Sequence, residues 1–150
     1  MYRTHTCGEL RINHVNHVDP LRDRFILSKG HAAPALFQVL AKRGFYPESW
    51  LNNYGENGSI FSEHPPAPDH LAGIEAATGS LGHGLPYSVG RALAEKINKT
   101  NNKIYVLISD GELNEGTTWE SLLFASFHKL DNLIIIIDYI HYHFIILRTI

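Results

Sequence analysis

The chain has 150 residues, a formal net charge of −2, 44% hydrophobic residues and 19% charged residues. These values are those of one globular domain with a sizeable core, and they argue against a nucleic-acid-binding protein. The single cysteine, Cys7, excludes an intrachain disulfide and fits a reducing compartment. Residues 1–19 lack the apolar core of a signal peptide, and the apolar run Leu133 to Ile137 is far too short to span a membrane. We therefore expect a cytoplasmic protein with no membrane association.

The first elements in chain order are a helix and a long loop. Residues up to about 24 show no clear periodicity. From Ala32 to Ala41 apolar residues recur at helical spacing, and Gly44 follows as a helix terminator. Residues 44–73 are rich in glycine and proline and predict a long loop, which in a compact domain is usually functional or mobile.

The second half of the chain predicts a βαβ unit. After a glycine-dense turn and a helix from about Leu85 to Ile97, the sequence predicts a strand over 104–108, a helix over 116–129 and a strand over 133–137. Both strands are almost continuously apolar, which is typical of parallel strands buried on both faces. The fold class is therefore α/β with a right-handed crossover. The helix between the strands carries an apolar face made of Trp119, Leu122, Leu123 and Phe127.

Asp110 and Gly111 directly follow the first of these strands. Ligands bind at the carboxyl ends of strands in open parallel sheets, and glycine lets a ligand approach the backbone closely. A carboxylate there suits Mg²⁺, whose shell phosphate oxygens and water complete. Asp-Gly is also among the commonest turn dipeptides, so the pair alone leaves a turn and a metal site equally open.

Glycines and histidines supply the other signals. Residues 79–84 match neither the dinucleotide fingerprint, because residue 87 is tyrosine, nor a P-loop, because no Gly-Lys-Ser/Thr follows. Taken alone, this segment predicts only a glycine-rich turn. Of the ten histidines, His31 and His64 stand beside glycine or proline at element boundaries, where functional histidines are common.

Several segments together resemble the N-terminal, thiamine-diphosphate-binding portion of transketolases. They occur in the family's order, over about residues 22–138: RDRFILSKGHAAPAL, EHP, GIEAATGSLGHGLPYSVGRALA, VLISDGELNEGTTWE and KLDNLIIIID. The resemblance implies a parallel sheet with flanking helices, incomplete in this chain. It divides the sequence into an unassigned segment, 1–21, a partial diphosphate-binding domain, 22–138, and an aberrant apolar tail, 139–150.

The resemblance also implies an activity. Transketolases use thiamine diphosphate and Mg²⁺ to transfer a two-carbon ketol unit between phosphosugars, and they work as dimers with active sites at the interface. The pyrimidine-binding domain is absent here, so the expected partner is a second copy or a complementary C-terminal chain, and we expect the chain alone to be inactive. Two alternatives stay open: a non-catalytic truncated remnant, and a fragment of a related enzyme such as a deoxyxylulose-phosphate synthase or a 2-oxo-acid dehydrogenase. The segment from Ser80 to Gly84 and the pair Glu115-Gly116 favour transketolase over the related enzymes.

The resemblance assigns roles near the cofactor to five of the residues in these motifs. His31 lies near the cofactor's diphosphate, and His64 contacts the reacting sugar. Gly79, Ser80 and Leu81 line the thiamine ring.

The same resemblance assigns roles to residues at and after the first predicted strand. Asp110 is the Mg²⁺ ligand, and Gly111 is the backbone contact to the diphosphate. Glu115 is a subunit-interface glutamate that links the two active sites. Two departures stand out: Ser109 replaces the usual glycine, and Ile140 stands where the family's Asp-x-Asn supplies a second metal ligand.

Residues 140–150, IHYHFIILRTI, resemble nothing in the family. The segment is β-prone, has no proline and is almost uncharged, and the sequence identifies no partner strand for it. Exposed, such a segment is an aggregation hazard that natural chains usually guard against. We therefore expect it to be the product of a frameshift, and the alternative is an edge strand of a shortened protein.

Overall fold

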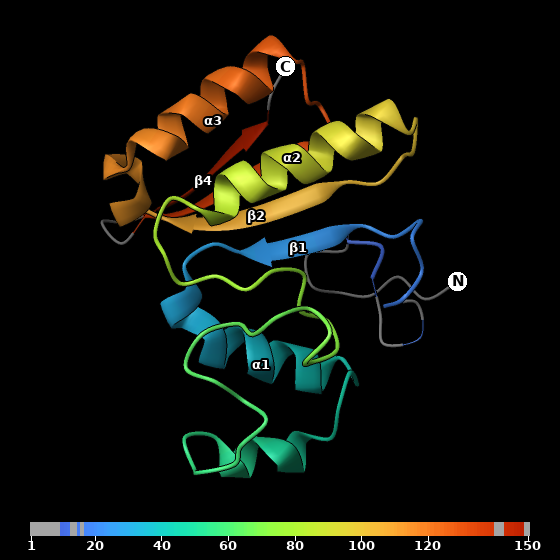
Figure 1. Ribbon diagram of the computed structural model, residues 1–150, viewed down its shortest axis with the longest axis vertical. Helices are drawn as coiled ribbons and strands as arrows, with labels where there is room; N and C mark the ends of the chain where they lie inside the picture. The colour runs from blue at the N-terminus through green and yellow to red at the C-terminus, as the bar shows by residue number, and fades with distance from the viewer. Residues whose placement is uncertain (1–9, 13–14, 16, 140–142, 149–150) are drawn as a thin grey trace.

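The computed structural model describes residues 10–12, 15, 17–139 and 143–148 (Figure 1). These residues form four strands and three helices, in the order β1 (Arg24–Leu27), α1 (Ala33–Lys42), α2 (Gly84–Ile97), β2 (Ile104–Ser109), α3 (Gly116–Phe127), β3 (Leu133–Tyr139) and β4 (His143–Arg148). Short 3₁₀ turns lie at Gly30–Ala32, Glu48–Asn53 and Gly111–Asn114. No helix in the described ranges is both long and apolar enough to cross a bilayer.

The strands form one sheet in the order β1-β2-β3-β4. β1, β2 and β3 are parallel, and Ile26 pairs with Val106, which in turn pairs with Ile135. The carboxyl ends of the three parallel strands therefore meet at one edge of the sheet, where Ser109 lies opposite Asp138. This confirms the predicted parallel sheet with flanking helices, and it adds β1, which the sequence pattern did not reveal.

α2 and α3 cover one face of the sheet, and α1 lies on the other side, beyond β1 (Figure 1). The core under α2 and α3 includes eight large side chains that are less than 2% exposed: Ile26, Leu85, Ile104, Val106, Ile108, Leu130, Leu133 and Ile135. Burial of each such side chain contributes about 1.5–3 kcal/mol relative to its exposure. Hydrophobic packing on this face thus fixes the strands whose ends carry the candidate site.

Of the apolar face predicted for α3, only Leu122 packs against the core, and the other three side chains face outward. Trp119 is 55% exposed, Leu123 71% and Phe127 82%. The small side chains of α3, Thr118, Ser121 and Ala125, face the interior instead. Small residues let the helix lie close to its neighbours, whereas Trp119, Leu123 and Phe127 are left on the outer surface.

The long loop after α1 is more ordered than its glycine and proline content predicts. It contains the 3₁₀ turn Glu48–Asn53 and contributes to a second apolar cluster around α1, formed by Phe37, Leu40, Tyr46, Phe61, Leu71 and Ile74. The hydroxyl of Tyr46 donates a hydrogen bond of 2.8 Å to the carbonyl of Phe37, and burial raises the pKa of this tyrosine. The loop therefore has a small core of its own.

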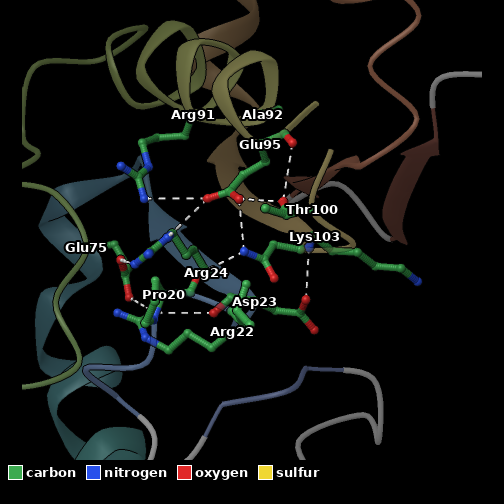
Figure 2. Close-up of polar contacts among 12 residues, drawn as sticks. Pro20, Arg22, Asp23, Arg24, Glu75, Arg91, Ala92, Glu95, Thr100 and Lys103 are labelled. Atoms are coloured by element: carbon green, nitrogen blue, oxygen red, sulfur yellow. Dashed lines mark hydrogen bonds and ion pairs between the residues drawn. The ribbon is translucent and has the colours of Figure 1, made fainter. Parts of the chain in front are cut away.

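A network of buried charges ties β1 to α2 and to the loop before it (Figure 2). The carboxylate of Glu75 accepts hydrogen bonds from Arg22 and, at 3.0 Å, from Arg24. Glu95 of α2 accepts from Thr100 and Asn102 at 2.6 and 2.9 Å. The guanidinium of Arg24 also lies 3.8 Å from Glu95, so the two carboxylates share one partly buried arginine.

All three helices end in the same hydrogen-bonded motif. In α1 the N–H of Phe45 donates to the carbonyl of Leu40. Gly44, which directly precedes Phe45, has a φ of 81°, the left-handed conformation expected of the predicted helix terminator. α2 and α3 place Lys99 (φ 56°) and Lys129 (φ 50°) at the equivalent position. A lysine in this left-handed region carries a backbone strain of about 1 kcal/mol that glycine avoids.

The segment 143–148 pairs antiparallel with β3 as the edge strand β4, with Asp138 opposite Phe144. The sequence offered no partner for this segment because pairing with an antiparallel neighbour leaves no pattern of its own in β3. The pairing agrees with the edge-strand alternative. Ile140, where the resemblance leads us to expect a second metal ligand, lies outside the described residues.

Candidate functional site

The site is built at the edge where the parallel strands end. The N–H of Asp110 donates to the carbonyl of Asp138 at 3.1 Å, which continues the β2–β3 ladder one residue beyond β2. The carboxylate of Asp110 is half-buried and caps the N–H of Gly111 at 2.8 Å. A Cβ on Gly111 would meet nothing closer than Ser109 Oγ, at 3.9 Å. Asp110 and Gly111, the strand tip, therefore present an oxygen ligand beside an open stretch of backbone.

Residues 79–84, the glycine-rich segment, pack tightly against three other parts of the chain. A Cβ on Gly79 would lie 2.9 Å from the ring of His64. One on Gly30, next to His31, would lie 2.8 Å from the Cα of Gly79. Gly82, with a φ of 74°, would place a Cβ 2.7 Å from the Cβ of Glu115. The absence of side chains at these glycines is what allows the segments to meet.

The structure thus brings the sequence-predicted residues into one region. The ring of His64 lies against Gly79, and His31 directly follows Gly30, which also contacts Gly79. Glu115 lies against Gly82. Ser80 is exposed and Leu81 is 37% exposed, so this part of the segment faces outward. The strand tip is joined to this group through a residue that the sequence did not single out, Glu112.

Glu112 lies in the 3₁₀ turn that follows the strand tip, and it is fully buried. Its carboxylate accepts from the N–H of Gly82 at 3.0 Å and from the N–H of Ser109 at 2.8 Å, and also from the hydroxyl of Ser28. Sequence reasoning missed it because a glutamate in a polar stretch after a strand is normally exposed. The only sequence signal was its neighbourhood, between a strand tip and a helix start.

Lys29 and Asp138 form a second feature that the sequence did not reveal. The ammonium of Lys29, after β1, donates to the carboxylate of Asp138, at the end of β3. The side chains are 14% and 31% exposed. They border a cavity of about 380 Å³ on the α1 side of the sheet, which is otherwise lined mainly by apolar side chains such as Phe25 and Leu107. The lysine thus neutralises a carboxylate that lies beside Asp110 in the sheet.

The chemistry of these residues fits the diphosphate end of a thiamine cofactor. The described part of the chain holds no cluster of three His, Cys, Asp or Glu side chains that could bind a metal ion by themselves. A single carboxylate, Asp110, suits Mg²⁺ that is held mostly by phosphate oxygens and water. The open backbone at Gly111 leaves room for those phosphates, so the metal and the diphosphate would bind together.

Comparisons with known proteins agree with this geometry. A sequence profile described as "Transketolase, thiamine diphosphate binding domain" matches residues 8–142, beginning inside the segment that the sequence patterns left unassigned. An apulose-4-phosphate transketolase subunit of Actinobacillus succinogenes is 49% identical over 121 residues, which are 81% of this chain and 44% of that protein. Human transketolase is 47% identical over 121 residues, which are 80% of this chain and 19% of that protein.

A solved structure, transketolase from Leishmania mexicana, superposes with a TM-score of 0.77 at 32% identity. The match covers 87% of this chain and 21% of the other. This chain therefore spans less than half the length of each of these relatives. The matched profile, the relatives and the fold together show that the chain belongs to the transketolase family and corresponds to its thiamine-diphosphate-binding domain.

Proposed function

We propose that this chain is the cofactor-holding part of a transketolase-type transferase that moves a two-carbon ketol unit between phosphosugars. The observation that carries the proposal is the convergence of the glycine-rich segment, with His64 against Gly79 and Glu115 against Gly82, beside the strand tip. Relatives that act on different substrates, apulose-4-phosphate and 6-deoxy-6-sulfo-D-fructose, bear the transketolase name. The family therefore supports the reaction type, and the choice of sugar belongs to residues of the complete site.

Each residue of the site has a defined task in this proposal. Asp110 would hold Mg²⁺, and the backbone at Gly111 and the ring of His31 would contact the diphosphate. Gly79, Ser80 and Leu81 would lie along the thiamine ring, with their outward-facing backbone open to it. His64 would contact the sugar. When bound, the cofactor supplies the nucleophilic carbon that carries the two-carbon unit, and the protein orients it and excludes water.

A partner chain completes the proposed site. Four large side chains on the outer surface of α3, Trp119, Leu123, Phe124 and Phe127, are between 42% and 82% exposed. Glu115 lies at the start of the same helix. A surface of this kind on a helix next to the site suits a second copy of the chain or a complementary C-terminal chain, and the relatives whose names describe them as transketolase subunits support such a partner. We place the assembly in the cytoplasm, in line with the single cysteine.

A non-catalytic remnant is the second candidate, and Ile140 favours it. The side chain of isoleucine has no oxygen to offer where the family's asparagine would complete the metal shell. In that case the chain keeps the glycine-rich segment and Asp110 but binds the cofactor weakly, and no partner restores activity.

Titration of the ¹⁵N-labelled chain with thiamine diphosphate, with and without Mg²⁺, tests the proposal. We expect weak, Mg²⁺-dependent binding with NMR shift changes at Gly111 and at residues 79–81, and no transferase activity without a partner. The absence of shifts at both places would refute the site. A calorimetric dissociation constant in the micromolar range or tighter would show that the chain needs neither a second metal ligand nor a partner to hold the cofactor.

A further inference from the structure

The buried side chain of Glu112 connects segments that are far apart in sequence, and we call it the clamp. Each oxygen of its carboxylate accepts from one backbone N–H: Oε1 from Gly82 at 3.0 Å and Oε2 from Ser109 at 2.8 Å. The hydroxyl of Ser28 donates to Oε1, and the hydroxyl of Ser109 donates to Oε2 at 3.3 Å. Because a backbone N–H can only donate, both oxygens must act as acceptors.

The clamp joins the two halves of the site. Gly82 belongs to the glycine-rich segment, whereas Ser109 is the last residue of β2 and directly precedes Asp110. The backbone of Glu112 is itself fixed, since the hydroxyl of Thr118 in α3 donates to its carbonyl at 2.7 Å. A fully buried side chain with every contact satisfied holds its partners at a set distance.

Gly82 is held from its other side as well. The hydroxyl of Thr117 donates to the carbonyl of Gly82 at 2.8 Å. Both polar groups of this one peptide residue, its N–H and its C=O, are therefore bound by side chains from the stretch that follows β2. The position of residues 79–81 relative to the strand tip depends on these two side chains.

We propose that Glu112 is a positioning residue that sets the spacing between the glycine-rich segment and the strand tip, so that one ligand can be held by its ring and by its diphosphate at the same time. The inference rests on the proposed function. Glu112 is fully buried and acts only through Gly82 and Ser109. Ser109 strengthens this arrangement. Where the family usually has glycine, its hydroxyl gives the carboxylate of Glu112 one more hydrogen-bond donor.

The test is the Glu112→Gln variant, which keeps the shape of the side chain but turns one acceptor into a donor. Whichever way the amide is oriented, its NH₂ group faces a backbone N–H, of Gly82 or of Ser109. The matched control is Glu120→Gln on the exposed surface of α3. Each protein is titrated by NMR with Mg²⁺ and either pyrophosphate, which senses the strand tip alone, or thiamine diphosphate, which needs both halves of the site.

Glu112→Gln is expected to weaken thiamine diphosphate binding about tenfold, the effect of one misplaced buried hydrogen bond, and to leave pyrophosphate binding within about twofold. Amide exchange at Gly82 and Ser109 should accelerate in this variant and not in Glu120→Gln. A general structural role would instead weaken both ligands equally, and that result, or unchanged thiamine diphosphate binding in a folded variant, overturns the proposal.

Two other outcomes also decide the question. If Glu112→Gln does not fold, Thr117→Val takes its place, because it removes the other bond to Gly82 at an exposed position. It must show the same selective loss of thiamine diphosphate binding, or the proposal fails. If the wild-type chain binds neither ligand, the proposed function fails, and the exchange rates at Gly82 and Ser109 alone decide whether Glu112 couples the two segments.

Discussion

Thr117 and Gly82 are fitted to each other at the start of α3. The hydroxyl of Thr117 donates to the carbonyl of Gly82 at 2.8 Å, and the same oxygen lies 2.6 Å from the place that a Cβ on residue 82 would occupy. The contact is possible only because residue 82 is glycine with a φ of 74°. The glycine-rich segment is therefore defined by close backbone approach within the protein as well as by any ligand.

Gly82→Ala is expected to destabilise the chain by about 2 kcal/mol or more, since it combines left-handed backbone strain with a steric clash. The control is Gly90→Ala in α2, where a Cβ would meet nothing within 4 Å. There, alanine should raise the free energy of unfolding by about 0.5–1 kcal/mol. Urea unfolding curves measure both. Similar effects of the two substitutions would contradict the close packing described around residue 82.

Lys99→Gly is expected to raise the free energy of unfolding by about 0.5 kcal/mol. Glycine relieves the strain of a φ of 56° at the end of α2, and loss of the lysine charge from the helix C-terminus offsets part of the gain. Lys99→Ala removes the same charge without relieving the strain, and it should not stabilise. Thermal unfolding of both variants measures the difference. Stabilisation by alanine as large as that by glycine would exclude backbone strain as the cause.

Glu75→Gln is expected to cost about 3 kcal/mol of stability. The substitution leaves the buried guanidinium groups of Arg22 and Arg24 without the carboxylate that binds both. Glu48→Gln serves as the control, because its pair with Lys42 is 3.9 Å long and exposed, and its loss should cost less than about 0.5 kcal/mol. Chemical unfolding at low and high salt distinguishes the pairs, since only the exposed pair is screened. A small effect at Glu75 would show that its charge is dispensable.

Asp23 should make the stability depend on pH. Burial opposes ionisation of its carboxyl group, but hydrogen bonds from Arg11 and from the N–H of Lys103 outweigh burial and place its pKa below the ordinary value. Because the folded-state pKa is lowered, the stabilisation is complete above the unfolded-state pKa of about 3.9 and is lost as the pH falls through the lower, folded-state value. Asp23→Asn should therefore be less stable than wild type near neutral pH, and the difference between their free energies of unfolding should become smaller below about pH 4. A difference that stays constant with pH would contradict this assignment.

Local patterns predicted the parts of the fold that rest on local physics. The apolar runs that became β2 and β3, and Gly44 at the end of α1, are recognisable from neighbouring residues alone. β1 is only four residues long and β4 depends on pairing with β3, so neither leaves a clear period in the sequence. The outward orientation of most of the apolar face of α3 was also not predictable, because apolarity alone does not say which side of a helix packs on the sheet.

The candidate site, like the fold, was predictable from the sequence only in part. Its residues follow from sequence motifs, and the resemblance to transketolases gives them roles. The contacts that unite the motifs were not predictable, since Glu112 joins positions 28, 82 and 109, and the pair Lys29–Asp138 joins the ends of β1 and β3. Such contacts depend on the strand order, which brings distant residues to one edge of the sheet.

Binding of Mg²⁺–thiamine diphosphate to Asp110→Ala and His128→Ala, followed by NMR alongside the wild-type chain, tests the central claim most directly. Asp110 is assigned to the strand tip, whereas His128 ends α3 with its ring against Phe124 and Phe127. The proposed site predicts that Asp110→Ala abolishes the Mg²⁺-dependent shifts at Gly111 and residues 79–81 and that His128→Ala keeps them. Equal losses in the two variants, or wild-type binding by Asp110→Ala, would contradict a cofactor site at the end of β2.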